Sequence, residues 1–256
     1  MDWLSTLAGF SVGLVVGVTG VGGGSLMTPL LVLLFGVNPA TAVGTDLLYA
    51  AITKAGGVVV HGRRRHVRWD IVGRLAAGSI PGALATLAVL ALAHVDSAAL
   101  GRLITHSLGF ALILTALAIV LKPRLQRWGS LANGPWRDRW IGRLTAVTGF
   151  ALGVLVTLSS VGAGALGVAA LFFLYPRLAT VEIVGSDIAH AVPLALVAGL
   201  GHAQLGTVDF SLLGSLLVGS LPGIALGSAL SARLPERLLR SGLASILVIV
   251  GGKLVL

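Results

Sequence analysis

Long apolar segments fill most of the chain, and they constrain its fold more than any other feature. A helix needs about 20 apolar residues to cross the hydrocarbon core of a bilayer. Only 11% of the residues are charged, against about 25% in a soluble domain, so most of the surface must face lipid. The sequence therefore predicts an all-α, polytopic membrane protein folded as a helical bundle. The apolar runs are Leu4–Gly20, Leu26–Phe35, Ala40–Val60, Ile71–Ala93, Ala98–Leu121, Trp140–Leu158, Leu166–Tyr175, Leu178–Leu200, Phe210–Ser231 and Glu236–Leu256.

Two of these runs are too short to cross a bilayer as straight helices. Leu26–Phe35 follows the glycine-rich break Gly20–Gly24, and Leu166–Tyr175 follows the break Gly162–Gly164. Each half of the chain crosses five times if its short run traverses the bilayer, or three times with a re-entrant pair if it does not. The bundle is therefore expected to contain broken or re-entrant helices.

The second half of the chain repeats the first at a shift of 140 residues, which becomes 141 after one insertion. The strongest matches are Val43–Asp46 with Val184–Asp187, His61 with His202, and Gly78–Gly82 with Gly219–Gly223. The sequence predicts an N-terminal transmembrane repeat at 1–121, a cytoplasmic linker at 122–139 and a C-terminal transmembrane repeat at 140–256. Prolines and glycines in the linker are expected to break the helix there.

Lysine and arginine are concentrated in loops, and this distribution predicts the orientation. The basic loops at 61–70 and 122–143 are expected on the cytoplasmic side of the cell inner membrane. The loop His202–Asp209, equivalent to His61–Arg68, has no lysine or arginine, so equivalent loops should face opposite sides. This predicts an inverted-topology repeat with the N- and C-termini outside. Because ten of the 18 lysines and arginines lie in these two loops, at the ends of apolar runs, nucleic-acid binding is not expected.

The motif that begins at the first glycine break resembles the TauE/SafE family of sulfite exporters. It comprises Gly20–Leu30, Pro39, Val43–Asp46 and Gly78–Gly82, and the resemblance covers both halves. It implies a secondary transporter that exports sulfite or an organosulfonate. Two positions depart from the pattern and bear on cargo and coupling ion: Asp46 stands where many members have serine, and Ala169 stands where the first half has Pro29.

The two glycine breaks are the predicted substrate site. A helix that begins after such a break presents unpaired N–H groups and the positive end of its dipole, which suits a small anion. The alternative is that the glycines only permit close helix packing. The predicted substrate-binding residues are the break residues with neighbouring hydroxyls and one lysine: Gly22, Gly23, Gly24, Ser25, Thr45, Lys54, Gly162, Ala163, Gly164 and Ser186.

Ionisable residues inside apolar runs are candidates for ion coupling, because placing them in a bilayer costs a few kcal/mol or more. Asp46 and Asp187 lie about two turns into their segments, and His190 follows Asp187 by one turn on the same face. These three are the predicted proton-coupling residues. The alternatives are an interfacial position for the aspartates and a hydrogen-bonded interior histidine. Lys54, whose counterpart is Ala195, either pairs with Asp46 or attracts the anion directly.

The residue patterns do not favour an enzyme, a metal site or a bound cofactor. Ser25 follows glycines but has no identifiable base, and the chain has no cysteine. His61, His66 and His202 have no further ligands nearby in the sequence.

We therefore expect alternating access around a site near the bilayer midplane. Proton coupling through Asp46 or Asp187 is optional, because the membrane potential already assists export of an anion. The expected partners are a small inorganic or organosulfur anion and the lipid bilayer, and a homo-oligomer stays an open alternative. The alternative function is an uptake transporter or channel for another small anion or a metal cation.

Overall fold

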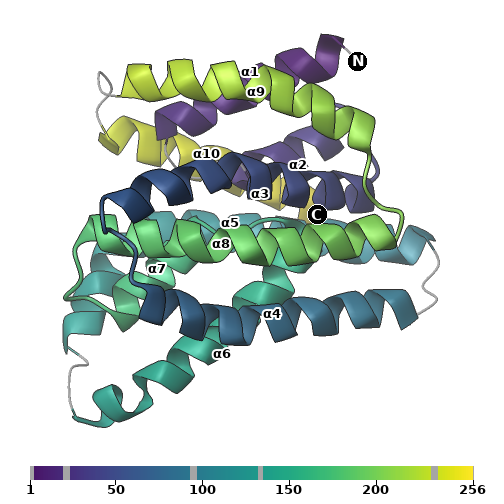
Figure 1. The fold of residues 1–256 in the computed structure, drawn as a ribbon. Coiled ribbons are helices and arrows are strands. Elements are labelled where there is room, and N and C mark those ends of the chain that lie inside the picture. Colours follow the sequence, from purple (N-terminus) through teal and green to yellow (C-terminus); the bar gives the residue numbers. More distant parts are fainter. Residues whose placement is uncertain (1–2, 20–23, 93–96, 132–134, 232–235, 256) are drawn as a thin grey trace.

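The computed structural model describes residues 3–19, 24–92, 97–131, 135–231 and 236–255, and the regular structure in these ranges is helical. This confirms the all-α bundle that the apolar runs predict (Figure 1). The helices are α1 (Trp3–Thr19), α2 (Gly24–Leu33), α3 (Pro39–Arg63), α4 (Trp69–Leu92), α5 (Ser97–Leu131), α6 (Pro135–Ser159), α7 (Ala165–Leu174), α8 (Thr180–Gln204), α9 (Phe210–Ser231) and α10 (Glu236–Val255).

Six stretches of the described helices are long and apolar enough to cross a membrane, which agrees with a multi-pass membrane protein. By contrast, α2 and α7 have ten residues each, about 15 Å of helix, or half the thickness of a hydrocarbon core. The short segments after the glycine breaks are therefore confirmed as short helices. The six stretches are Pro39–Arg63, Trp69–Leu92, Gly101–Leu131, Arg139–Ser159, Thr180–Gln204 and Phe210–Gly227.

The prediction that the linker at 122–139 breaks the helix is wrong for most of its length. Helix α5 continues through Pro123 to Leu131, and α6 already begins at Pro135. Packing against α7 accounts for the difference. The ammonium of Lys122 lies 4.6 Å from the ring centroid of Phe172, and Gly129 packs so closely on the backbone of α7 that no Cβ would fit. These contacts stabilise a helix that the proline alone would weaken.

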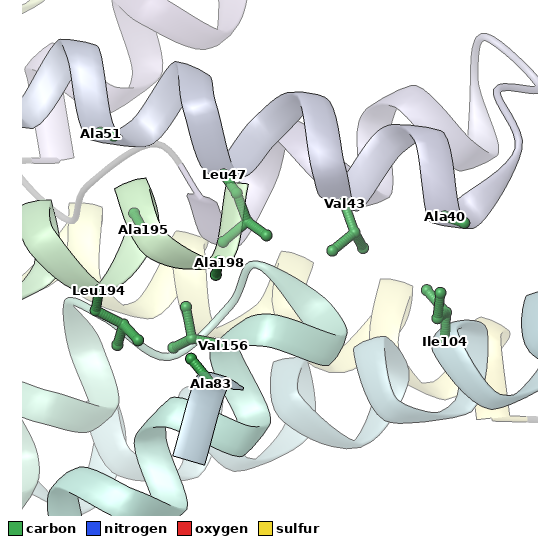
Figure 2. Packing of buried hydrophobic residues seen from close by; sticks show 10 residues of the cluster. All are labelled: Ala40, Val43, Leu47, Ala51, Ala83, Ile104, Val156, Leu194, Ala195 and Ala198. Carbon is green, nitrogen blue, oxygen red and sulfur yellow. The ribbon is translucent and has the colours of Figure 1, made fainter. Parts of the chain in front are cut away.

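Helices α3 and α8 pack against each other in the middle of the bundle and run antiparallel (Figure 1). Around this pair, helices of different halves pack together. Helix α1 of the first half packs on α9 of the second half, and α4 of the first half packs on α6 of the second half. The buried core between them joins five helices from both halves (Figure 2). Its residues are Ala40, Val43, Leu47, Ala51, Ala83, Ile104, Val156, Leu194, Ala195 and Ala198.

Residues that match in the sequence repeat also make matching contacts in the structure. A Cβ on Gly44 in α3 would collide with the carbonyl oxygen of Thr207, in the turn between α8 and α9. A Cβ on Gly185 in α8 would likewise collide with the carbonyl oxygen of His66, in the turn between α3 and α4. These two turns lie at opposite ends of the bundle (Figure 1). Each turn therefore packs on the first part of the equivalent helix in the other half.

Candidate functional site

Asp46 is fully buried in the second turn of α3 and faces the short helix α2. The hydroxyl of Thr28 in α2 donates a hydrogen bond of 2.5 Å to its Oδ2. Its other oxygen, Oδ1, is buried without a hydrogen-bond partner. The hydroxyl of Ser160, at the end of α6, also interacts with this carboxyl group. Asp46 thus lies where a short helix of its own half meets the second glycine break.

Asp187, the equivalent residue in α8, has different neighbours. It is 1% exposed, and its Oδ1 lies against Gly167 in α7, where a Cβ would collide with it. This oxygen has no hydrogen-bond partner. The position equivalent to Thr28 is held by Val168, so α7 offers no hydroxyl to Asp187. The two aspartates occupy matching places with unlike surroundings.

The second glycine break has a backbone that only glycine adopts readily. Gly162 and Gly164 have φ angles of 124° and 140°, outside the range that residues with a side chain favour. The chain turns here between the end of α6 and the start of α7 at Ala165. At the start of α7 the N–H groups of Gly167 and Val168 donate to the carbonyl oxygens of Gly162 and Gly164 at 3.1 Å and 2.9 Å, so those of Ala165 and Leu166 are left at the break.

Lys54 in α3 reaches this break from the other half of the chain. Its Nζ donates a hydrogen bond of 2.6 Å to the carbonyl oxygen of Ala163, which lies between the two glycines with positive φ angles. Its charge acts on Asp46, Asp187 and His190, yet it forms no ion pair within 4.0 Å of either carboxyl group in the described structure. The lysine is therefore held by backbone at the break, beside two carboxyl groups.

His190 lies one turn after Asp187 in α8 and is fully buried. Its Nε2 shares a hydrogen bond of 2.8 Å with the hydroxyl of Ser79 in α4. Its Nδ1 is buried without a partner, so the ring is not bonded to Asp187 in this conformation. A hydrogen-bonded interior histidine, one of the two interpretations of the sequence, describes this geometry.

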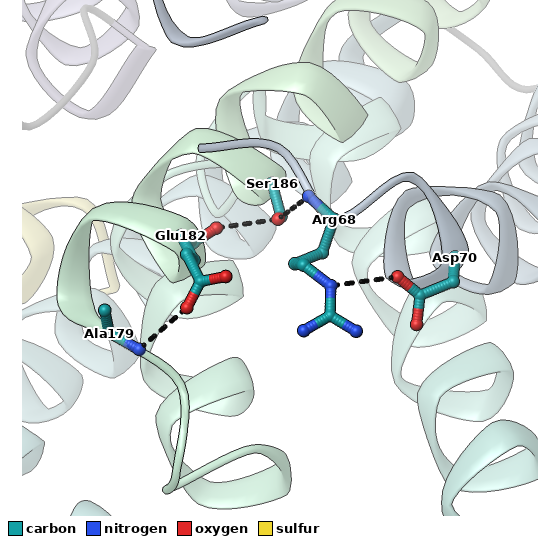
Figure 3. A network of polar contacts seen from close by, with 5 residues as sticks. All are labelled: Arg68, Asp70, Ala179, Glu182 and Ser186. Atoms are coloured by element: carbon teal, nitrogen blue, oxygen red, sulfur yellow. Dashed lines mark hydrogen bonds and ion pairs between the residues drawn. The ribbon is translucent and has the colours of Figure 1, made fainter. Parts of the chain in front are cut away.

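The hydroxyls of Thr45 and Ser186 join the two halves at the turns between helices. The backbone N–H of Asp209 donates to Thr45 Oγ1 at 3.0 Å, and that of Arg68 donates to Ser186 Oγ at 2.9 Å. The Ser186 hydroxyl itself donates to the carbonyl oxygen of Glu182 at 2.6 Å (Figure 3). In this conformation both hydroxyls therefore contact protein backbone.

The first glycine break lies mostly outside the described residues. Gly22 and Gly23 are not among them, whereas Gly24 and Ser25 form the start of α2. Among the described residues, no group of three or more histidine, aspartate or glutamate side chains is placed to hold a metal ion. The site that the structure assembles thus contains the second break with Lys54, Asp46 and Asp187.

Comparison with known proteins identifies the family of this chain. The model of the family described as "Sulfite exporter TauE/SafE" matches residues 5–254. The chain belongs to the TauE/SafE family. It is 41% identical over 252 residues to the "Probable membrane transporter protein YjnA" of Bacillus subtilis (strain 168), covering 97% of this chain and 98% of the relative.

A second relative, the "Probable membrane transporter protein YdhB" of the same organism, is 27% identical over 240 residues, covering 94% of each chain. A "Probable membrane transporter protein" of Xylella fastidiosa (strain Temecula1 / ATCC 700964) is 27% identical over 237 residues, covering 89% of this chain and 84% of the relative. No solved structure matches the chain. This TauE/SafE protein is therefore a multi-pass membrane transporter, as the sequence motifs suggested.

Several polar residues of this TauE/SafE site were not predicted from the sequence. Thr28, Ser79 and Ser160 contact the buried ionisable groups, and Gly167 makes room for the Asp187 carboxyl. The sequence signal that could have indicated these residues is a hydroxyl in or beside a short apolar helix, as for Thr28 and Ser160. That signal is weak, since hydroxyls are common in membrane helices, where they also bond to their own backbone.

Proposed function

We propose that this transporter exports a small sulfur-containing oxyanion, sulfite or an organosulfonate, across the cell inner membrane. The observation that carries the proposal is the position of Lys54, whose ammonium lies at the second glycine break. The same break holds the N-terminal end of α7, which carries a positive partial charge. An ammonium and a helix N-terminus at one buried place attract a small oxyanion.

The break residues Gly162, Ala163 and Gly164 are the proposed backbone ligands in the second half. In the first half the proposed ligands are Gly22, Gly23, Gly24 and Ser25. Thr45 and Ser186 are proposed to donate hydroxyls to the cargo. Because these two hydroxyls are bonded to the turns in this conformation, they would serve the cargo only when the turns separate.

Asp46, Asp187 and His190 are the proposed proton carriers. A carboxylate at Asp187 lies against the first turns of α7, where it would repel an oxyanion bound at the same helix end. Neutralising that carboxyl group removes the repulsion, so binding of the anion and binding of a proton favour each other. An inside-negative potential assists export by about 2.3 kcal/mol per charge for each 100 mV.

The proposed cycle is alternating access by two inverted repeats. It is supported by the equivalent turns at opposite ends of the bundle and by the paired contacts that each makes with the other half. We place the loops at 61–70 and 122–143 in the cytoplasm because both are rich in arginine. Both termini are then placed outside, because each half crosses the membrane an odd number of times.

Sulfite flux through the purified protein in liposomes tests the proposal. We expect the wild-type protein to move sulfite well above protein-free vesicles, and Lys54→Met to lower the rate at least about 10-fold, since it removes a half-buried ammonium group at the site. Lys253→Met, an exposed lysine near the end of α10, is the matched control and should keep the wild-type rate.

Equal sulfite flux in protein-free vesicles and in vesicles with the wild-type protein would contradict the proposal. A panel of sulfate, sulfoacetate and divalent metal ions identifies the cargo class. Transport of a divalent metal without any sulfur anion would favour the alternative of a cation transporter, for which the two buried carboxyl groups are the natural ligands.

A further inference from the structure

The buried cluster around the second glycine break holds more carboxyl groups than ammonium groups. Asp46 and Asp187 face a single lysine, Lys54, and the described structure gives none of the three an ion pair within 4.0 Å. One ammonium balances one carboxylate. With both aspartates ionised, the cluster needs a second cation, because an uncompensated charge in a bilayer interior is costly.

The oxygen atoms that would receive such a cation are gathered at Asp46. Its carboxyl group is accompanied by the hydroxyls of Thr28 and Ser160. Asp187 has no equivalent hydroxyls, because Gly167 and Val168 stand on the facing helix. A small hard cation prefers oxygen ligands, so the surroundings of Asp46 suit it better than those of Asp187.

Two of these oxygens are buried and lack hydrogen-bond partners. Asp46 Oδ1 is fully buried, and Ser160 Oγ belongs to a residue that is 5% exposed. The Ser160 hydroxyl is near enough to the Asp46 carboxyl group to stabilise its charge, but the two groups do not meet the geometry of a hydrogen bond. Buried polar atoms in native proteins are normally paired, and a cation bound by both of these oxygens would satisfy them together.

The end of α6 adds negative potential at the same place. The helix ends at Ser159, and Ser160 follows with a φ of 57°, which stops the helix abruptly. Of the carbonyl groups at this helix end, that of Val156 accepts from the N–H of Ser160 and that of Thr157 bonds to the ring of His202. Those of Leu158 and Ser159 have no intrahelical donor and carry a negative partial charge. In membrane transporters, such helix ends and unwound carbonyls are typical ligands of sodium.

We infer that Asp46, Thr28 and Ser160 supply the side-chain ligands of a sodium site, with carbonyl oxygens from the end of α6 completing it. This refines the coupling role of Asp46 and rests on the proposed function, because sodium replaces the proton as the coupling ion bound at Asp46. Asp187 and His190 keep the role proposed above.

Sodium binding to the purified full chain in detergent tests this site without any cargo. We expect the unfolding midpoint to rise by about 3 °C or more when choline chloride is replaced by sodium chloride at constant ionic strength, and not when it is replaced by potassium chloride. Asp46→Asn should abolish the sodium-dependent rise, whereas Asp187→Asn should keep it. Monodisperse elution on size exclusion checks that each variant is folded.

Two milder variants probe the hydroxyl ligands. Ser160→Ala and Thr28→Val should each weaken the apparent sodium affinity about 10-fold, and Thr28→Val also makes α2 resemble α7 at this position. Thr115→Val is the matched control, since Thr115 Oγ1 is likewise buried without a partner but lies in α5, which supplies no ligand to the proposed site. It should leave sodium affinity unchanged.

Absence of a sodium-dependent rise in the wild-type protein would overturn the site, as would an equal rise with potassium or a rise that persists in Asp46→Asn. A midpoint that responds to pH and not to sodium would assign the place to a proton and also overturn it. The transport proposal fails separately: sodium binding without sulfite flux contradicts export alone, and sulfite flux without sodium binding contradicts the sodium site alone.

Discussion

At the residue scale, the interior of this bundle holds ionisable side chains without ion pairs, namely those of Asp46, Lys54 and Asp187. Each is an ionisable side chain placed among apolar helices, and none has an ion pair in the described structure. Backbone and hydroxyl groups replace ion pairs: Ala163 accepts from Lys54, and Thr28 donates to Asp46. Buried charges held this way are free to exchange partners with a small ion, which an ion pair would oppose.

Gly167 provides a residue-scale prediction because its missing side chain makes room for the Asp187 carboxyl group. Gly167→Ala should displace that carboxyl group, destabilise the protein by about 1–3 kcal/mol and lower sulfite flux. Thermal unfolding and liposome flux measure both effects. Gly101→Ala is the control, since a Cβ there meets nothing within 4 Å. Wild-type flux and stability in Gly167→Ala would contradict the placement of Asp187.

Lys54→Met is a second residue-scale prediction, and it differs from Gly167→Ala in its expected effect on stability. It removes the charge but retains a long apolar side chain, so we expect lost flux with little change in stability. Replacement of a buried charge by an apolar side chain of similar volume is often neutral or stabilising. Thermal unfolding compared with sulfite flux checks this, and a large loss of stability would show that Lys54 is needed for folding.

At the scale of elements, glycines set how closely α4 approaches α6 and how closely α9 approaches α1. In α4 a Cβ on Gly78 would collide with the backbone of Ala146 in α6, and in α9 a Cβ on Gly219 would collide with the backbone of Thr6 in α1. Small residues that bring backbones together are the usual basis of helix association in a bilayer, where apolar side chains gain nothing over lipid.

These interfaces give a matched set of alanine substitutions. Gly78→Ala and Gly219→Ala should each destabilise the protein by about 1–3 kcal/mol, because the backbone contacts leave no room for a methyl group. Gly73→Ala and Gly214→Ala, five residues earlier in the same two helices, meet nothing within 4 Å and should be neutral or slightly stabilising. Thermal unfolding of the four variants, compared within each helix, decides between these outcomes.

At the scale of the whole molecule, two halves of unequal composition share one arrangement. The equivalent turns at the ends of α3 and α8 close on the other half at opposite ends of the bundle. If the bundle spans the bilayer with these ends in opposite aqueous phases, the two turns must be reached from different sides of the membrane.

Cysteine labelling tests this orientation, and the chain has no native cysteine to give background. Arg64→Cys lies in the exposed turn after α3, and Gln204→Cys lies at the exposed end of α8. An impermeant maleimide should label Gln204→Cys in intact cells and Arg64→Cys only after the membrane is opened. Labelling of both in intact cells would contradict inverted repeats.

Much of this fold could be predicted from the sequence because membrane helices are read from local composition. Apolar runs gave the spans, and glycine breaks gave the short helices α2 and α7. The site could be predicted only in part, because its contacts join distant residues: Lys54 and Ala163 are 109 positions apart. The helix through Pro123 was missed for the same reason, since packing on α7 outweighs the local preference.

The contact between Lys54 and Ala163 has no mirror image, because Ala195 occupies the place equivalent to Lys54. If the repeats were identical, exchanging their conformations would yield two states of equal free energy. If transport exchanges the two conformations as proposed, the equivalent contact in the exchanged state falls at Ala195, which carries no charge. The two states would then differ in free energy, so cargo would half-saturate the protein at different concentrations on the two sides, although detailed balance keeps the unidirectional fluxes equal when no gradient is present.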